Sequence, residues 1–344
     1  MWRVGSKGSF QVGKLPMGIL EGLLDKYCGA DPRVLMGPGI GRDATVIEMG
    51  ERLVVVKTDP ITFATERIGW YAVHVNANDV ACVGARPRWF LADLLLPEKA
   101  TSQELVEEIF SQIKGACGEL GCVLCGGHTE ISLGFGRPVV VGVMVGEVEK
   151  GKLIPSNGAK PGDIVLLTKQ IAIEGTSLLA REHPKLRDSL TEDEILRCSE
   201  LLFSPGISVV REAMAASETG SVHAMHDPTE GGLMTALWEM ARACGLDIVV
   251  HEEKIPVMEE TEKVAHVLGI DPMGLLASGS LLICAGREGV EEVIGAITAA
   301  GVKATPIGEV REGKGNVFIS RGKDMILAPM FSRDEVARAF QEIS

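Results

Sequence analysis

Segments with the pattern of a buried strand alternate along this sequence with segments that have the pattern of a helix. Strand patterns occupy residues 52–60, 122–125 and 138–148, and helix patterns occupy residues 65–87 and 105–120. Such alternation, in place of blocks of a single element type, is typical of proteins in which helices cover the faces of sheets. The sequence therefore predicts an α/β (α+β) fold.

The chain is long enough for two domains. Its 344 residues exceed the usual limit of one hydrophobic core, and its aromatic content of 4% predicts cores built mainly from aliphatic side chains. Residues 153–163, LIPSNGAKPGD, concentrate the residue types that favour loops. We therefore expect a first domain at residues 1–155 and a second at residues 156–344.

Charge and hydropathy exclude several classes of function. The formal net charge of -13 disfavours general binding to nucleic acid, which needs a positive surface. The amino-terminal residues have no apolar run of signal-peptide length, and no segment reaches the roughly 18 apolar residues of a membrane span. We expect a cytoplasmic protein with neither a nucleic-acid nor a membrane partner.

Local signals predict several element boundaries. The strand at 52–60 is expected to run into a turn at Pro60, and the strand at 122–125 is expected to end in a glycine turn. Gly121 is expected to end the helix before that second strand. Capping boxes, which mark the first turn of a helix, are expected at Thr101 with Glu104, Thr191 with Glu194, and Ser332 with Glu335.

The eight cysteines are scattered, which is not the pattern of a disulfide framework in a chain of this length. Cys122 and Cys125 form a C-x-x-C near His128, and a zinc or redox site is one interpretation of that spacing. However, residues three apart in a strand point to opposite faces. Small buried side chains are therefore the expectation at most of these positions.

Four aspartates lie in short polar segments between apolar ones and are candidate cation ligands: Asp43, Asp59, Asp79 and Asp227. Magnesium prefers oxygen ligands and is typically held by a few carboxylates together with substrate phosphates. Alternatives exist for two of them, because Asp59 precedes a proline as in many turns, and Asp227 before Pro228 is a common helix start. Asp79 lies inside an apolar helical pattern, where a buried carboxylate needs a partner.

Three glycine-rich segments, GPGIGRD, CGGHTE and PTEGGL, are candidates for phosphate contacts through backbone amides. Simple tight turns are the alternative. The sequence has no G-x-x-x-x-G-K-[ST] segment, and the glycines of GPGIGRD do not have the G-x-G-x-x-G spacing. If ATP binds, it binds by another architecture.

The order of short motifs resembles one family over residues 35 to about 285. GPGIGRDATVI, KTDP, NANDVACVGARP, GGHTE, KPGDIVLLTK, IEGTSLLA, HDPTEGGL and LASGSLL follow one another as in the aminoimidazole ribonucleotide (AIR) synthetase superfamily. This superfamily includes selenophosphate synthetase, thiamin-monophosphate kinase and the hydrogenase-maturation protein HypE. NDVACVGARP and DPTEGGL look most like HypE and its relatives.

The resemblance implies a two-domain PurM-like fold. In that fold the sheet of an amino-terminal ATP-binding and dimerisation domain forms a barrel across a homodimer, and the carboxy-terminal domain is an α/β sandwich. ATP and Mg²⁺ are the cofactors that it implies, and a homodimer is the implied functional unit. A maturation partner protein is a further implied partner.

The resemblance also assigns site residues. The four aspartates, Asp43, Asp59, Asp79 and Asp227, fall on metal and ATP-phosphate positions, and Asp79, Asp227 and His128 on catalytic ones. The nucleotide loop would hold Gly126, Gly127, Thr129 and Glu130, where Glu130 compensates for His128 in place of the aspartate that many members carry. Lys7 and Lys14 resemble a segment that closes over ATP, although a solvated basic tail is equally consistent.

The implied activity is ATP-dependent phosphorylation of an amide- or thiocarbamoyl-type oxygen. HypE modifies its own carboxy-terminal cysteine, whereas the last cysteine here is Cys284, within a predicted strand. We therefore expect a carbamoyl-type acceptor that is a separate small molecule, unless the sequence is truncated. The alternatives are a phosphotransferase like thiamin-monophosphate kinase and a non-catalytic nucleotide-binding maturation partner.

Overall fold

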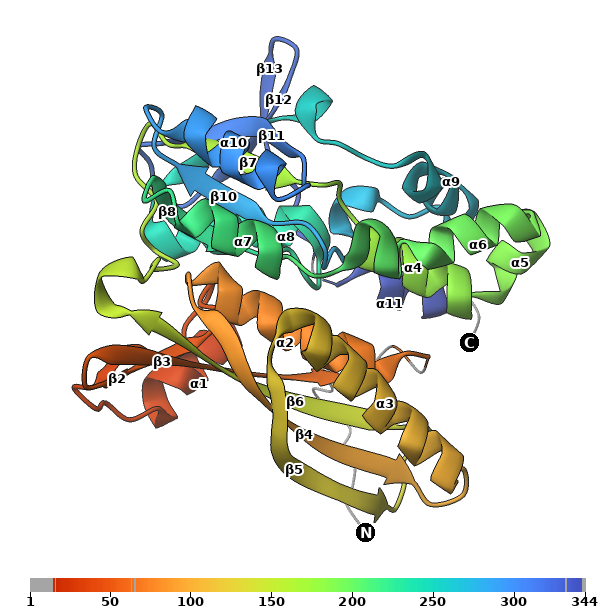
Figure 1. Cartoon of the computed structure of the whole chain (residues 1–344). Coiled ribbons are helices and arrows are strands. Elements are labelled where there is room, and N and C mark those ends of the chain that lie inside the picture. The colour runs from red at the N-terminus through yellow and green to blue at the C-terminus, as the bar shows by residue number, and fades with distance from the viewer. Residues whose placement is uncertain (1–14, 16, 63, 65, 332, 342–344) are drawn as a thin grey trace.

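The computed structural model describes residues 15–341 except 16, 63, 65 and 332. These residues form two sheet-rich domains, stacked one on the other (Figure 1). The segment between the two sheets, residues 150–163, contains the expected loop at 153–163. Within the described residues no helix is both long and apolar enough to cross a membrane.

The first domain contains a six-stranded sheet in the order β1-β2-β3-β6-β4-β5. Neighbouring strands are antiparallel except β4 and β5, which are parallel. The elements are α1 (Met17–Tyr27), β1 (Val34–Met36), β2 (Thr45–Met49), β3 (Arg52–Ile61), α2 (Ile68–Cys82), β4 (Arg86–Pro97), α3 (Gln103–Leu120), β5 (Val123–Ser132) and β6 (Val139–Glu149).

The second domain contains a seven-stranded sheet in the order β13-β12-β9-β11-β7-β10-β8, in which β9 and β12 are the parallel pair. Its strands are β7 (Ile164–Thr168), β8 (Val222–His226), β9 (Asp247–His251), β10 (Leu282–Ala285), β11 (Ala304–Arg311), β12 (Val317–Arg321) and β13 (Asp324–Leu327). Its α-helices are α4 (Ile173–Glu182), α5 (Pro184–Ser189), α6 (Glu192–Glu200), α7 (Val210–Ser217), α8 (Gly232–Cys244), α9 (Glu259–Leu268), α10 (Val290–Ala299) and α11 (Glu335–Gln341). Short helical turns are η1 (Lys150–Lys152), η2 (Leu202–Gly206), η3 (Glu252–Lys254) and η4 (Pro272–Gly274).

Helix α2 lies between the first sheet and the second domain (Figure 1). It packs on β3 and β6 on one side and on α7 and β8 on the other. Every residue of α2 except Trp70 is buried, which explains why its sequence is apolar on all faces instead of on one stripe. The few polar residues of α2 are therefore placed where the two domains meet.

Two predicted turns are wrong. Strand β3 continues through Pro60, which is paired with Val141 of β6. Beyond Val56 the described part of β3 pairs with β6 alone, and an edge position tolerates a proline because no second partner needs its missing N–H. Strand β5 likewise continues through Gly126 and Gly127.

Gly127 belongs to this strand for a steric reason. Its φ is 138°, and a Cβ atom built on it would lie 2.0 Å from the carbonyl oxygen of Ala92 in β4. Gly127 thus permits a close approach of two parallel strands, which is one of the known uses of glycine within a sheet. The glycines alone predict a turn, but pairing with β4 decides the conformation of this segment.

Helix ends agree with the sequence in most places. Gly121 ends α3 in the left-handed conformation, and Thr191 with Glu194 forms a complete capping box at α6. The predicted cap of α3 at Thr101 is wrong: Ser102 accepts the amide hydrogen of Leu105, and the Thr101 hydroxyl donates to the carbonyl of Pro97. The third predicted box depends on Ser332, which lies outside the described residues.

Asn78 of α2 links the two domains directly. Its Nδ2 donates to the carbonyl oxygen of Ile207 and its Oδ1 accepts from the amide of Val209, both at 2.8 Å. The side chain is fully buried, so neither backbone group has water as a substitute partner.

We predict that Asn78→Ala lowers the free energy of unfolding by about 3 kcal/mol, because it leaves a buried carbonyl and a buried amide unpaired. Urea denaturation measures this loss. The exposed Asn157, changed to Ala, is the matched control and should change stability by less than about 0.5 kcal/mol. Equal stability of the two variants would show that the Asn78 bridge does not hold the domains together.

Candidate functional site

Four aspartates that are far apart in the sequence come together where the two domains meet. Asp59 lies in β3 and Asp79 in α2, while Asp43 precedes β2 in the loop after β1. Asp227 follows β8 directly and belongs to the second domain. Asp43, Asp79 and Asp227 are less than 10% exposed. The structure therefore confirms that the carboxylates converge.

Lys57 joins two of these carboxylates. Its Nζ lies 3.2 Å from Asp59 Oδ2 and 3.2 Å from Asp79 Oδ2. Burial acts to lower the pKa of Lys57, but the nearby carboxylates, Asp79 first and then Asp59, raise it above its ordinary value. Lys57 thus carries a positive charge that offsets part of the negative charge of the cluster.

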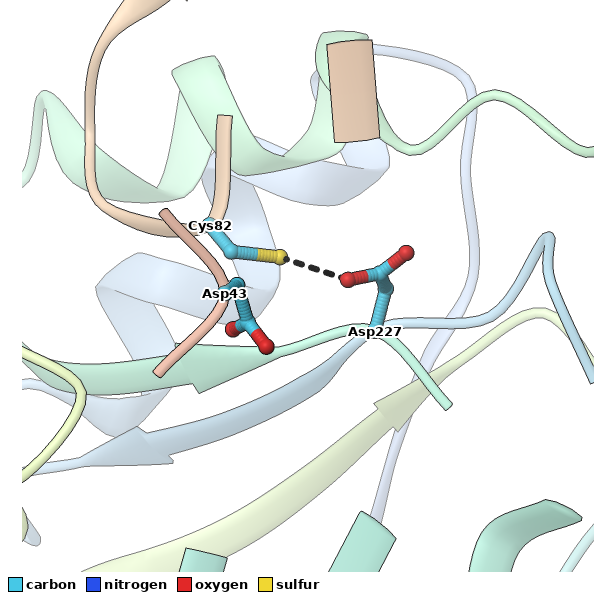
Figure 2. A group of neighbouring side chains, drawn as sticks. All are labelled: Asp43, Cys82 and Asp227. Carbon is cyan, nitrogen blue, oxygen red and sulfur yellow. Dashed lines mark hydrogen bonds between the residues drawn. The ribbon is translucent and has the colours of Figure 1, made fainter. Parts of the chain in front are cut away.

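Asp43, Cys82 and Asp227 form the buried centre of the site (Figure 2). One ligand atom from each lies within 4.8 Å of the others. The Cys82 thiol donates a hydrogen bond to Asp227 Oδ1 at 3.4 Å. Burial, followed by the charges of Asp227 and Asp43, raises the pKa of Cys82 well above its usual range. Cys82 is therefore a neutral hydrogen-bond donor to Asp227.

His226 positions Asp43. Its Nδ1 lies 2.8 Å from Asp43 Oδ1, and its Nε2 lies 3.0 Å from Glu239 Oε2 of α8. Burial acts to lower the pKa of His226, but these two carboxylates, Asp43 first, raise it well above its ordinary value. The ring is therefore a buried imidazolium that forms an ion pair with a carboxylate on each side and donates a hydrogen bond through Nε2 to Glu239.

The glycine-rich loop brings Asp43 into place through a close approach to α8. Gly41 has a φ of 67°, and a Cβ atom there would lie 2.6 Å from the carbonyl oxygen of Glu239. A larger residue at this position would push the loop away from α8, and Asp43 with it. Gly41 therefore serves the packing that positions a carboxylate, whether or not its amide also contacts a ligand.

The donor atoms of the centre fit a hard divalent cation. Asp43 Oδ2 and Asp227 Oδ2 are buried and have no hydrogen-bond partner among the described residues. Leaving buried carboxylate oxygens unpaired is costly, and a cation with oxygen ligands removes that cost. Burial, together with the charge of Asp43, raises the pKa of Asp227 to about 6, so these side chains alone resist a second negative charge.

The glycines after Asp227 do not leave their amides free, contrary to the expectation from the sequence. Gly231 donates to Asp334 Oδ2 at 2.6 Å, and Gly232 donates to the carbonyl of Thr229 at 3.0 Å. Helix α8 begins at Gly232 with Gly231 as its cap, so Asp227 is not the N-cap residue. The simple structural interpretation of Asp227 as a helix cap is therefore wrong.

Strand β5 carries the residues expected in a nucleotide loop: Gly126, Gly127, His128, Thr129 and Glu130. Among the described residues, no hydrogen bond or ion pair joins them to the acidic cluster. The only ion pair among them joins His128 Nε2 to Glu130 Oε2 at 3.5 Å, and both side chains are more than half exposed. Lys7 and Lys14 lie outside the described residues, so their expected role is not tested.

Sequence reasoning missed the residues that neutralise the site. Lys57 had a usable signal, because it lies two residues before Asp59 in a strand and side chains at that spacing share a face. His226 is the neighbour of Asp227, but its contacts with Asp43 and Glu239 join three distant segments. No local pattern could reveal those contacts.

Both domains of the chain have counterparts in known proteins. The sequence matches the AIR synthase related protein family, its N-terminal domain over residues 41–148 and its C-terminal domain over residues 160–320. It is 31% identical to the carbamoyl dehydratase HypE of Cupriavidus necator over 283 residues, which are 79% of this chain and 77% of that protein.

Solved structures of HypE have the same fold. One is HypE in complex with ATP, with a TM-score of 0.70 and 22% identity, covering 92% of this chain and 91% of the other. Another is a HypE–HypF complex, with a TM-score of 0.73 and 22% identity, covering 91% of this chain and 99% of the other.

We predict that Asp227→Asn stabilises the protein at neutral pH in the presence of a chelator, by about 2 kcal/mol. The folded protein keeps a proton on Asp227 up to about pH 6, whereas the unfolded chain releases it near the ordinary pKa of 3.8. The free energy of unfolding of the wild-type protein therefore falls as pH rises through that interval. The Asp227→Asn variant should not show this fall, because its side-chain amide does not ionise. Urea denaturation at neutral pH and at about pH 4 measures the difference, which should vanish at the lower pH.

Asp324→Asn, at an exposed position of β13, is the control and should show no such dependence on pH. A loss of stability in Asp227→Asn at both pH values would contradict the prediction, since the charge of Asp227 would then be stabilising.

Proposed function

Because the chain belongs to the AIR synthase related protein family, we propose that it is an enzyme that uses Mg²⁺ and ATP to phosphorylate an amide- or thiocarbamoyl-type oxygen. The observation that carries this proposal is the pair of buried, unpartnered carboxylate oxygens of Asp43 and Asp227, one from each domain. Asp59 and Asp79 both belong to the first domain, and Lys57 pairs with each of them.

In this proposal Asp43 and Asp227 hold a magnesium ion, and Asp59 and Asp79 provide further carboxylates near it. When bound, Mg²⁺ supplies neutralisation of phosphate charge and ATP supplies the phosphoryl group. The protein contributes mainly position: Lys57 and the imidazolium of His226 fix the carboxylates before the nucleotide arrives. Cys82 stays protonated and orients Asp227.

The acceptor class follows from the chemistry of the HypE relative, which is a carbamoyl dehydratase. Removing water from a carbamoyl group requires its oxygen to leave, and a phosphorylated oxygen is a far better leaving group. The products are then ADP, inorganic phosphate and the dehydrated acceptor. Cys284 is unsuited to carry the carbamoyl group, because it is buried in β10 and burial raises the pKa of its thiol well above the usual range. We therefore propose that the acceptor is a separate small molecule and not Cys284.

Titration calorimetry tests the nucleotide site. We expect ATP to bind to the wild-type protein in a magnesium-dependent way, and Asp79→Asn and Asp227→Asn each to weaken binding by about 100-fold. Asp324→Asn is again the control and should bind as wild type does. ATP that binds equally with and without magnesium would contradict the assignment of the acidic cluster.

Product analysis distinguishes the alternatives once binding is established. Acceptor-dependent release of both ADP and inorganic phosphate supports dehydration. A phosphorylated product without free phosphate would instead mean a phosphotransferase of the thiamin-monophosphate kinase type. Magnesium-dependent binding without any turnover would leave a nucleotide-binding maturation partner.

A homodimer is part of the proposal. Strand β5 is an edge of the first sheet, paired with β4 alone among the described strands. Val123, Ile131 and Leu133, on or next to β5, are 59%, 58% and 82% exposed. An apolar sheet edge of this kind is a site for pairing with another chain, and a second copy that completes a barrel would cover it. His128, Thr129 and Glu130 on the same strand would then face the partner copy. The HypF seen with HypE makes a maturation partner protein a further part of this proposal.

We predict that Ile131→Asp converts the dimer to a monomer, because it buries a charge in the apolar contact between copies. Light scattering coupled to size exclusion measures the mass. Leu196→Asp, at a position 58% exposed on α6, is the matched control and should leave the dimer intact. A wild-type protein that is monomeric at high concentration would overturn the proposal.

A further inference from the structure

Cys82 places a sulfur atom beside the two carboxylates that carry the proposed magnesium site (Figure 2). It lies three residues after Asp79 on α2, a spacing that puts two side chains on the same face of a helix. Its Sγ lies 3.4 Å from Asp227 Oδ1, and one ligand atom from each of Asp43, Cys82 and Asp227 lies within 4.8 Å of the others. The group therefore offers a cation a soft donor as well as hard ones.

The separation of the sulfur from the oxygen suits a zinc ion. Zinc is bound tetrahedrally, with Zn–S bonds of about 2.3 Å and Zn–O bonds of about 2.0–2.2 Å, so a sulfur and an oxygen ligand lie roughly 3.6 Å apart. The 3.4 Å between Cys82 Sγ and Asp227 Oδ1 is close to this value. Three protein ligands with water as the fourth are a common zinc coordination. Asp43, Cys82 and Asp227 supply three such ligands.

The carboxylates point to a bound ion independently of the thiol. Asp43 Oδ2 and Asp227 Oδ2 have no hydrogen-bond partner among the described residues, and the two residues are only 7% and 1% exposed. Buried carboxylate oxygens without a partner are costly, and a cation removes that cost. A single ion satisfies both oxygens without the room that an organic ligand needs.

Burial alone does not explain where the Cys82 thiol lies. Cys284 is equally buried, in β10, and its sulfur contacts Met240 Sδ at 3.3 Å within the apolar core. The sulfur of Cys82 is instead directed at a carboxylate oxygen of the opposite domain. It therefore lies where a cation held by Asp43 and Asp227 can reach it.

We propose that Asp43, Cys82 and Asp227 bind a thiophilic divalent cation, zinc, in competition with Mg²⁺. The ion replaces the proton of the Cys82 thiol, which passes to solvent, and no electron is transferred. Magnesium prefers oxygen ligands and leaves the thiol protonated. The inference rests on the proposed function in one respect, because zinc would exclude the magnesium that this function requires. Its test needs neither nucleotide nor turnover.

Titration calorimetry with Zn²⁺ alone, against a competing chelator, measures the affinity of the full-length protein. We expect Cys82→Ser to weaken zinc binding on the order of 100-fold, because it removes the thiolate ligand. The same substitution should change the affinity for Mg²⁺ by less than about 3-fold, because magnesium does not use the sulfur. Cys198→Ser, which removes a thiol on α6 that is also buried, is the matched control and should bind zinc as wild type does.

Cadmium gives a direct signal of the bond to sulfur. A thiolate bound to Cd²⁺ has a charge-transfer band in the ultraviolet that carboxylates alone do not produce. We expect this band in the wild-type protein and in Cys198→Ser, and its loss in Cys82→Ser. Excess Mg²⁺ should remove the band from the wild-type protein. Circular dichroism checks that each variant is folded.

X-ray absorption at the zinc edge needs no substitution and so does not depend on whether a variant folds. The zinc-loaded wild-type protein should show one sulfur neighbour at about 2.3 Å, together with oxygen neighbours.

Four outcomes would overturn the proposal. The first is a wild-type protein without a high-affinity zinc site, and the second is equal zinc affinity in folded Cys82→Ser. The third is a cadmium band that this substitution leaves unchanged. The fourth is a zinc spectrum with no sulfur neighbour or with more than one. Each would leave magnesium-dependent ATP binding to be judged by its own titration, whereas zinc bound through Cys82 in a protein that binds no ATP would overturn the proposed function alone.

Discussion

The carboxylates of Asp43, Asp79 and Asp227 are buried against one another where the two domains meet, and two basic side chains keep that arrangement folded. Lys57 bridges Asp79 to Asp59, and the imidazolium of His226 bridges Asp43 to Glu239. Uncompensated charges at such depth would cost several kcal/mol each. The charges of both signs come from β3, α2, β8 and α8, so the site forms only where all four elements converge.

Much of the fold could be predicted because local and global signals agree there. The apolar pattern of α3 and its glycine stop predicted that helix, and the capping box of Thr191 with Glu194 predicted the start of α6. Convergence of the aspartates could be predicted as well, since each follows or interrupts an apolar segment and oxygen ligands for one cation must gather. The helix boundaries could be predicted because they depend on residues that are neighbours in the sequence.

The remaining features depend on pairing between distant segments. Pro60 and the glycine pair of β5 look like turns in isolation, but β6 and β4 hold them in extended conformations. Likewise, the amide of Gly231 is occupied by Asp334, more than a hundred residues away. His226 could not be recognised as a cation from its sequence position, because the two carboxylates that protonate it come from Asp43 and α8.

The bridge made by Asn78 has a consequence for how the two domains can move. Asn78 is the immediate neighbour of Asp79 on α2, and it binds the backbone at Ile207 and Val209 of the second domain. A rotation of one domain against the other must therefore break this bridge or drag α2 along with it. Breaking the bridge changes the separation of Asp79 from Asp227, whereas moving α2 with the second domain changes the separation of Asp79 from Asp59 in β3. The orientation of the two domains and the arrangement of the four carboxylates are therefore coupled through two adjacent residues of one helix.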